Sequence, residues 1–349
     1  QPMLPVAAKA MLHQWEEPCL VGDHGAGCVF FSGCSLRCCF CQNGSISQGD
    51  VGKPVTAERL REIFRELIAG GAACLDLVTP TQFVPAVLAP MVKPGTQRLS
   101  DVTRWKEELV LPDLDAIDWE AAAAQETAKW DRENKISFMM LINGIFERTH
   151  ALMGFEDALC AMYEEPEAYH ELIEAITDYK VKLIGIIGKY YKPDVLCFHD
   201  DYGANDRMLM SVAQWEEFFK EPLRRVIEAT HAAGIIYEHH SCGYIAPIFD
   251  QLVELGIDAI DPLQISNPVR ELKDKYQDRV TFVGGFDNQN VFDRVGVTEE
   301  EIRAEVVRTY EVMAPGGSFV AFPLTVSFDF VPTFIDEHFK HAFRFGQQS

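Results

Sequence analysis

The sequence has few basic residues and no long apolar run. Its 31 lysines and arginines stand against 53 acidic residues, which gives a formal net charge of −22. Nucleic acids and anionic membranes are bound by clustered Lys and Arg, so this balance argues against both partners. No apolar stretch reaches the roughly 18 residues of a membrane-spanning helix. Residues 1–15 also lack the basic segment and apolar block of a signal peptide.

Cysteine is scarce outside one short segment. Ten cysteines in 349 residues are too few for a disulfide scaffold, yet five of them lie between Cys28 and Cys41. Such crowding indicates metal ligation in a reducing compartment. We therefore expect a cytoplasmic protein of an anaerobe-like cell. Because 48% of the residues are hydrophobic, a sizeable core can form.

The crowded segment, residues 27–42, reads GCVFFSGCSLRCCFCQ and contains Cys34-x3-Cys38-x2-Cys41. Three thiolates with this spacing can ligate a [4Fe–4S] cluster and leave its fourth iron without a protein ligand. An open iron site is what a cluster needs if it is to bind and reduce a cosubstrate. The alternative is a zinc site that recruits a fourth ligand from Cys28, Cys39 or His24.

Four segments around these cysteines resemble radical S-adenosylmethionine proteins related to the pyruvate formate-lyase activating enzyme. They are HQWEEPC (13–19), HGAGCVFFSGC (24–34), CQNGSISQGDVGK (41–53) and DLVTPTQFVP (76–85). The resemblance implies that Cys34, Cys38 and Cys41 bind the cluster and that S-adenosylmethionine chelates the fourth iron. It ends near Ala89, after one expected strand (27–31), one helix (57–69) and a second strand (74–78), so only part of such an enzyme is present.

The remaining chain shows regular alternation of strand and helix patterns. Apolar runs bounded by loop residues occur at 136–142, 194–199, 235–240, 257–260, 280–284 and 318–322. Amphipathic stretches of helical period, such as 212–233 and 299–313, lie between most of them. This pattern predicts an α/β fold with a parallel sheet.

A closed barrel of this type needs eight strands. We therefore expect a (β/α)8 TIM-type barrel whose first two strands come from the N-terminal strand–helix–strand unit. The domains are then an iron–sulfur module (residues 1–90) and a partial barrel (residues 91–349). Packing of the two parts as separate compact domains is the alternative.

Five polar motifs follow the expected strands: FHDDYG (198–203), EHHSCGYIAP (238–247), IDPLQ (260–264), FVGGFD (282–287) and APGGSFVAFP (314–323). Together, over about residues 95–346, they resemble the uroporphyrinogen decarboxylase superfamily. They are most similar to its branch of cobalamin- and coenzyme M-type methyltransferases. The resemblance implies an enzyme with its active site at the C-terminal mouth of the barrel.

His240 and Cys242 are two residues apart on an expected strand, so their side chains point the same way. Imidazole and thiolate suit zinc, and an incompletely ligated zinc can activate a substrate thiol. In methyltransferase relatives a Cys or His near the last strand completes the site. Residues 319–330 contain neither. Candidates for the third ligand are Glu238, His199 and Asp261.

Further candidates are His199, Asp200 and Asp201, which follow one strand, and Asp287, which follows another. These groups can hold a metal, orient a cationic substrate centre or exchange protons, so we expect catalytic roles for them. The alternative for at least one of the paired aspartates is to cap a helix or turn. For Asp287, the two preceding glycines indicate that a tight turn is the alternative.

These features predict zinc- and corrinoid-dependent methyl transfer, with a small molecule or a corrinoid protein as substrate. A tetrapyrrole decarboxylase is a second hypothesis, although no RQAGRY-like segment is present. A radical or electron-transfer protein acting through the N-terminal cluster is a third. A fusion in which the cysteine module is inert is a fourth.

Overall fold

The computed structural model describes residues 4–13, 24–33, 46, 51–72, 74–78, 98–323 and 330–346, with side chains up to residue 342. The chain divides into two compact units, residues 1–96 (unit 1) and 97–349 (unit 2). Among the described residues, no helix has the length and apolar character needed to cross a membrane.

Unit 1 contains a four-stranded sheet in the order β3-β1-β2-β4. Its strands are β1 (Val6–His13), β2 (Ala26–Phe31), β3 (Lys53–Pro54) and β4 (Leu75–Val78). The amphipathic helix α3 (Ala57–Ala69) packs on the sheet through Leu60, Ile63, Phe64 and Leu67. Thr56 caps this helix, because its hydroxyl accepts a hydrogen bond from the backbone N–H of Arg59. The expected strand, helix and second strand are all present, whereas β1 was not predicted.

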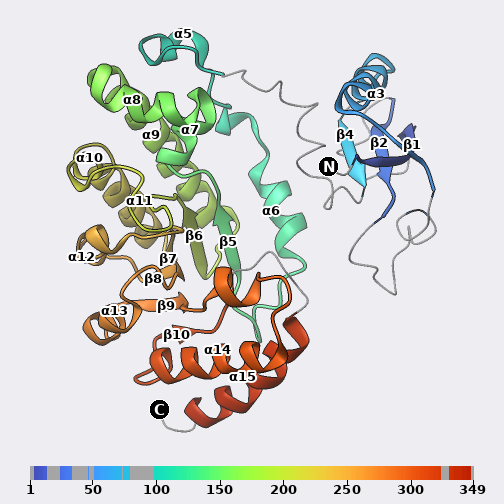
Figure 1. The fold of residues 1–349 in the computed structure, drawn as a ribbon. Coiled ribbons are helices and arrows are strands. Elements are labelled where there is room, and N and C mark those ends of the chain that lie inside the picture. The colour runs from blue at the N-terminus through green and yellow to red at the C-terminus, as the bar shows by residue number, and fades with distance from the viewer. Residues whose placement is uncertain are drawn as a thin grey trace. The chain divides into compact units, whose positions relative to one another are not determined.

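Unit 2 is built on six strands that pair in parallel in the order β10-β9-β8-β7-β6-β5 (Figure 1). Every strand expected from the apolar runs is present. Their bounds are β5 (Phe138–Leu141), β6 (Val195–His199), β7 (Ile236–His240), β8 (Ala259–Leu263), β9 (Thr281–Gly284) and β10 (Phe319–Val320).

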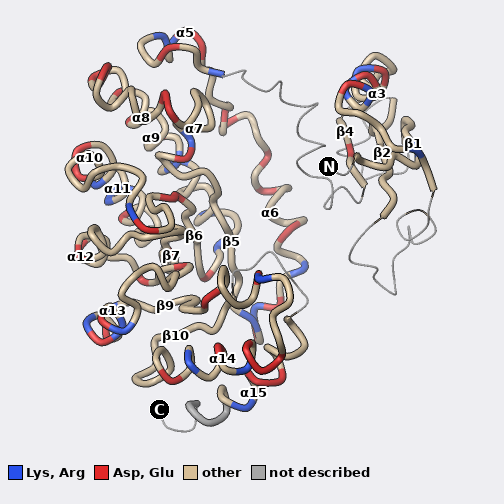
Figure 2. The backbone as a smooth tube through the Cα atoms, in the orientation of Figure 1, with Lys and Arg blue, Asp and Glu red and all other residues tan. Residues whose placement is uncertain are grey.

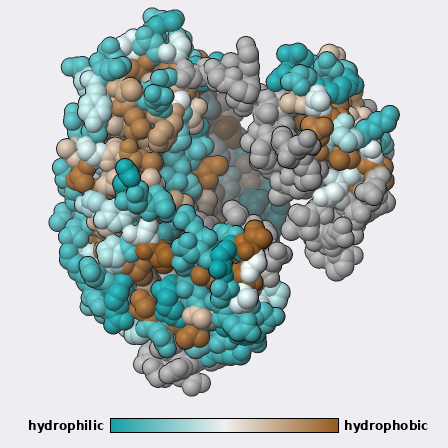
Figure 3. Space-filling model, in the orientation of Figure 1, coloured by the Kyte–Doolittle hydropathy of each residue, from teal (hydrophilic) through white to brown (hydrophobic). Residues whose placement is uncertain are grey.

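Helices connect these strands and lie outside the sheet (Figure 1). Acidic and basic residues are interspersed along them (Figure 2), and the face shown in Figure 3 carries separate apolar patches within a hydrophilic surface. The helical segments are η2 (Val102–Arg104), α5 (Trp105–Glu108), η3 (Leu114–Ala116), α6 (Trp119–Thr127), α7 (Phe146–Met153), α8 (Phe155–Glu164), α9 (Pro166–Tyr190), α10 (Val212–Phe218), α11 (Lys220–Ala232), α12 (Ala246–Leu255), α13 (Val269–Tyr276), η4 (Asn288–Phe292), α14 (Glu299–Met313) and α15 (Val331–Gly346).

The α/β class and the parallel sheet are confirmed, but the strand pairing does not confirm a closed eight-stranded barrel. Among the described strands, each sheet pairs only within itself. Strand β2, which we expected to be the first barrel strand, pairs with β1 on one side and with β4 on the other. Its hydrogen-bonding edges are therefore both used inside unit 1.

Strand β5 forms one edge of the six-stranded sheet. Alternate apolar residues are exposed along β5 and just beyond its two ends: Ile136 (75%), Phe138 (48%), Met140 (46%) and Ile142 (58%). Residues at this spacing lie on one face of a strand. The described sheet therefore leaves one face of β5 uncovered.

Candidate active site

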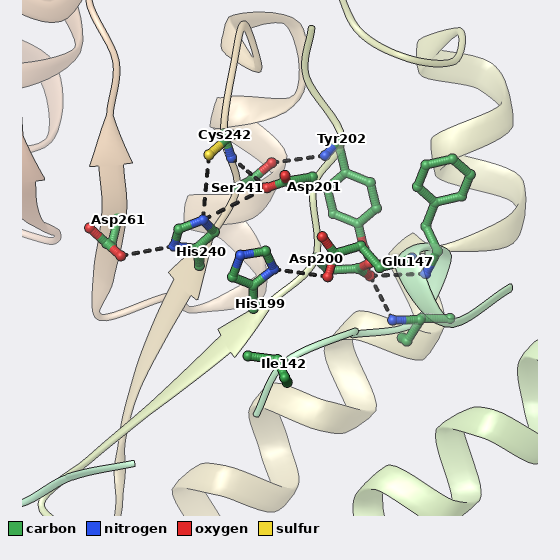
Figure 4. Close-up of polar contacts among 12 residues, drawn as sticks. Ile142, Glu147, His199, Asp200, Asp201, Tyr202, His240, Ser241, Cys242 and Asp261 are labelled. Atoms are coloured by element: carbon green, nitrogen blue, oxygen red, sulfur yellow. Dashed lines mark hydrogen bonds and ion pairs between the residues drawn. The ribbon is translucent and has the colours of Figure 1, made fainter. Parts of the chain in front are cut away.

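The carboxyl ends of three neighbouring strands bring His199, His240 and Asp261 together (Figure 4). β6 ends at His199 and β7 ends at His240, and the two residues are register partners. His240 is in turn the register partner of Asp261 on β8. The rings of His199 and His240 stack with their centroids 3.8 Å apart. Parallel pairing thus places three ligand-type side chains side by side at one edge of the sheet.

His240 is held in a defined orientation by Asp261. Its Nδ1 lies 2.9 Å from Asp261 Oδ2, and both side chains are almost completely buried. When Nδ1 carries the proton and donates it to this carboxylate, Nε2 keeps its lone pair. Nε2 lies 3.5 Å from Cys242 Sγ and 3.8 Å from Asp201 Oδ1. This orientation leaves Nε2 as the ring nitrogen available to a metal, and it directs Nε2 at two other potential ligands.

The loop that carries Cys242 is fixed by close backbone contacts. The backbone N–H of Cys242 donates to Asp201 Oδ1 at 2.7 Å. Gly243 has φ +79°, and a Cβ there would lie 2.4 Å from the carbonyl carbon of Gly203. Only glycine permits both this conformation and this approach. Burial raises the pKa of the Cys242 thiol to about 12, so the thiol is protonated unless a metal stabilises the thiolate.

His199 and Asp201 are the other donors close to His240. One ligand atom from each of these three residues lies within 4.8 Å of the others. His199 Nδ1 is 2.8 Å from Glu147 Oε2, and this hydrogen bond raises the pKa of His199. Glu147 was not predicted from the sequence, because it lies on α7 within an ordinary helical pattern. Its position in the first turn of the helix that follows β5 is the sequence signal that could have identified it.

A second donor group combines His240 with Asp261 and Cys197. Burial raises the pKa of the Cys197 thiol, and the nearby carboxylates of Glu238 and Asp261 add to this effect. Burial also raises the pKa of Glu238 to about 7. Neither donor group found in the described part of the chain includes Glu238 or Cys242, although Cys242 Sγ lies 3.5 Å from His240 Nε2. The geometry therefore favours His199 or Asp201 over Glu238 as a partner of His240 Nε2.

Asp200 has a different role from its neighbour Asp201. It is fully buried, and its carboxylate accepts hydrogen bonds from the backbone N–H groups of Ile145, Phe146 and Glu147 at 2.8–3.1 Å. The hydroxyl of Tyr202 donates a fourth, at 2.7 Å. Burial raises the pKa of Asp200 to about 6. These contacts make Asp200 a positioning residue that anchors the start of α7.

Asp287 lies apart from these donor groups, after β9. Its carboxylate accepts from the backbone N–H of Asn290 at 3.0 Å and caps η4. It lines a cavity of about 250 Å³ together with Gln264 and several other polar residues. The side-chain oxygen of Gln264 accepts a hydrogen bond from the backbone N–H of Gly243. The cavity therefore borders the loop that carries Cys242.

The remaining predicted ligands, Cys34, Cys38 and Cys41, lie outside the described residues. Of unit 1, the structure describes strands β1 and β2, which precede these cysteines, and β3, α3 and β4, which follow them.

Comparison with known proteins identifies two domain types. The uroporphyrinogen decarboxylase (URO-D) family matches residues 80–323, and the 4Fe-4S single cluster domain matches residues 22–100. The chain therefore belongs to the uroporphyrinogen decarboxylase family, and it carries a 4Fe-4S cluster domain that includes the three predicted cysteine ligands. No curated protein matches the chain.

A solved structure supports the fold of the chain. A methyltransferase from Methanosarcina mazei superposes with a TM-score of 0.54 at 15% identity, covering 70% of this chain and 71% of that one. Xylanase B from Clostridium stercorarium F9 is 14% identical and covers 44% of this chain and 54% of that one. Its TM-score of 0.29 does not indicate a shared fold. At 15% identity, the similarity to the methyltransferase shows a shared fold and does not by itself show a shared activity.

Proposed function

We propose that the chain is a zinc-dependent methyltransferase that moves a methyl group from a corrinoid to a thiol. The observation that carries this proposal is the pairing of His240 Nε2 with Cys242 Sγ at 3.5 Å, at the carboxyl ends of parallel strands in a protein of this family. The donor set fits the metal, because imidazole nitrogen, thiolate sulfur and carboxylate oxygen are the ligands that zinc takes in proteins.

In this proposal His240 and Cys242 hold zinc, with Asp201 or His199 as third ligand. Zinc, when bound, supplies a Lewis acid that lowers the pKa of a substrate thiol. If Asp201 is the ligand, His199 is free to accept the thiol proton at Nε2, because its Nδ1 faces Glu147 at 2.8 Å. Asp200 keeps Glu147 in place by anchoring the start of α7. A corrinoid, free or bound to a protein, would present the methyl group, and its cobalt would keep the electron pair of the broken Co–C bond.

The test combines metal analysis with two assays on anaerobically purified protein. We expect about one zinc in unit 2 and methyl transfer from methylcobalamin to a small thiol. Acid-group loss from uroporphyrinogen without a metal requirement would instead support the tetrapyrrole decarboxylase. Absence of zinc together with absence of methyl transfer would refute the proposal.

The substitution Asp261→Asn tests how His240 is oriented. The introduced amide would keep the shape of the side chain but lose the charge that fixes the Nδ1–H tautomer, so we expect zinc affinity to fall about 10- to 100-fold. Competition with a fluorescent zinc chelator measures the change. Asp258→Asn is the matched control, because Asp258 pairs with His231 in a half-exposed position. Equal affinities in the two variants would contradict the assigned role of Asp261.

The N-terminal domain supports a second function. Its match to a 4Fe-4S single cluster domain favours a cluster bound by Cys34, Cys38 and Cys41, and S-adenosylmethionine at the open iron is the corresponding cosubstrate. Radical or electron-transfer chemistry would then reside in this domain.

Substituting one of these cysteines tests the cluster. Wild-type protein is expected to contain about four irons per chain and Cys38→Ser fewer than about one, because a cubane cluster needs its thiolate ligands. Iron analysis and the visible absorption of anaerobic samples measure this loss. Cys39→Ser, in the same segment, is expected to retain its iron. Loss of iron in both variants, or in neither, would reject the predicted ligand set.

A further inference from the structure

A second pocket of unit 2, of about 290 Å³, combines apolar walls with three cationic side chains. Residues 109–112, Leu152 and Ile176 supply the apolar part, and Arg98, Arg148 and Lys180 supply the charges. His240 and Cys242 are not among its lining residues. Three basic groups in one pocket are unexpected in a chain whose net charge is −22.

Lys180 is the most deeply placed of the three cations, with only 3% of its surface exposed. Its Nζ donates to the backbone carbonyl of Ile142 at 3.2 Å and lies 5.9 Å from the ring centre of Phe198. Burial, and to a smaller extent the charge of Arg148, lower the pKa of Lys180 to about 8. A buried ammonium group is costly unless an anion compensates it.

The nearest carboxylates are already engaged. Asp200 and Glu147 both act electrostatically on Lys180. Asp200, however, accepts four hydrogen bonds at the start of α7 and from Tyr202, and Glu147 bonds His199. Within the described part of the chain, Lys180 forms no salt bridge, and neither does Arg148. The pocket therefore presents positive charge that the protein does not neutralise by direct pairing.

We propose that this pocket binds a small organic carboxylate. Its anionic group would lie against Arg148 and Lys180, and its short apolar body against Leu152 and Ile176. A guanidinium can form two parallel hydrogen bonds with a carboxylate, and the ammonium adds a third charge-assisted donor. The volume of about 290 Å³ is at the lower end of ligand pockets and suits a small molecule. Arg148 follows Glu147 on α7, so the pocket and the His199 side of the active site share one helix.

Calorimetric titration of the metal-stripped full chain with hexanoate tests this proposal, because removal of zinc prevents binding of the carboxylate at His240. We expect one hexanoate per chain. The neutral isostere 1-hexanol is expected to bind at least about tenfold more weakly, since it forms no charge-assisted hydrogen bonds. Arg148→Gln and Lys180→Met are each expected to weaken hexanoate by about tenfold or more. Lys182→Gln is the matched control, because Lys182 lies on the same helix but pairs with Asp115 on the exposed side.

Equal binding of hexanoate and 1-hexanol would overturn the proposal, as would the absence of hexanoate binding. Equal affinities of Arg148→Gln and Lys182→Gln would overturn it as well. Circular dichroism establishes that each variant is folded. If a pocket variant fails to fold, the comparison of hexanoate with 1-hexanol on the wild-type chain decides. None of these outcomes depends on methyl transfer.

Discussion

Cys242→Ala is expected to reduce the zinc bound by unit 2 from about one equivalent to below about 0.1 and to abolish methyl transfer. Cys242 Sγ is the sulfur donor on the Nε2 side of His240, at 3.5 Å. Without this thiolate, zinc would keep only the imidazole of His240 and one group from Asp201 or His199. Metal analysis after gel filtration and the methylcobalamin assay measure the two effects. Cys160→Ala is the control, since Cys160 is an exposed free cysteine on α8.

Cys197→Ala distinguishes the two donor groups that contain His240. If zinc lies on the Nε2 side, Cys197→Ala retains it, because Cys197 belongs to the group on the Asp261 side. Nδ1 of His240 is already occupied by Asp261 at 2.9 Å. Loss of zinc in Cys197→Ala and its retention in Cys242→Ala would move the site to the other group and refute the assignment made here.

The sequence allowed the strands of unit 2 and the pair His240 and Cys242 to be predicted. Short apolar runs predicted all six strands, because buried parallel strands read as continuous hydrophobic segments. The two-residue spacing predicted that both side chains point the same way along one strand, but Cys242 lies in the loop directly after β7. Its Sγ nevertheless lies 3.5 Å from His240 Nε2. Register pairing, which no local pattern encodes, adds His199 and Asp261 as neighbours of His240 on either side.

Other parts of the site depend on contacts between distant segments. Glu147 is 52 residues from His199 in sequence, and only the packing of α7 beside β6 brings them together. Asp200 and Asp201 are adjacent and chemically identical, yet one anchors α7 and the other contacts the loop of Cys242. The direction of each side chain after the strand ends decides this difference. The pairing of β1 with β2 is likewise a tertiary preference that no local sequence pattern encodes.

Asp200→Ala is expected to destabilise unit 2 by about 3–5 kcal/mol, a large part of the stability of a typical domain. The substitution leaves three backbone N–H groups at the start of α7 and the hydroxyl of Tyr202 without their acceptor. These donors are buried, so water cannot replace the lost bonds without opening the structure. Denaturant unfolding followed by circular dichroism measures the change.

Asp201→Asn is the matched control, because it alters the adjacent aspartate, whose side chain is 30% exposed. We expect it to change stability by less than about 1 kcal/mol, since its single backbone hydrogen bond can be kept by the amide oxygen.

The two variants thus distinguish the structural role of Asp200 from the proposed metal-binding role of Asp201. Asp200→Ala should lose stability and, through displacement of Glu147, alter the environment of His199. Asp201→Asn should fold normally and bind zinc more weakly if its carboxylate is the third ligand. A folded Asp200→Ala protein of wild-type stability would contradict the anchoring role, because four buried donors would then have lost their acceptor at no cost.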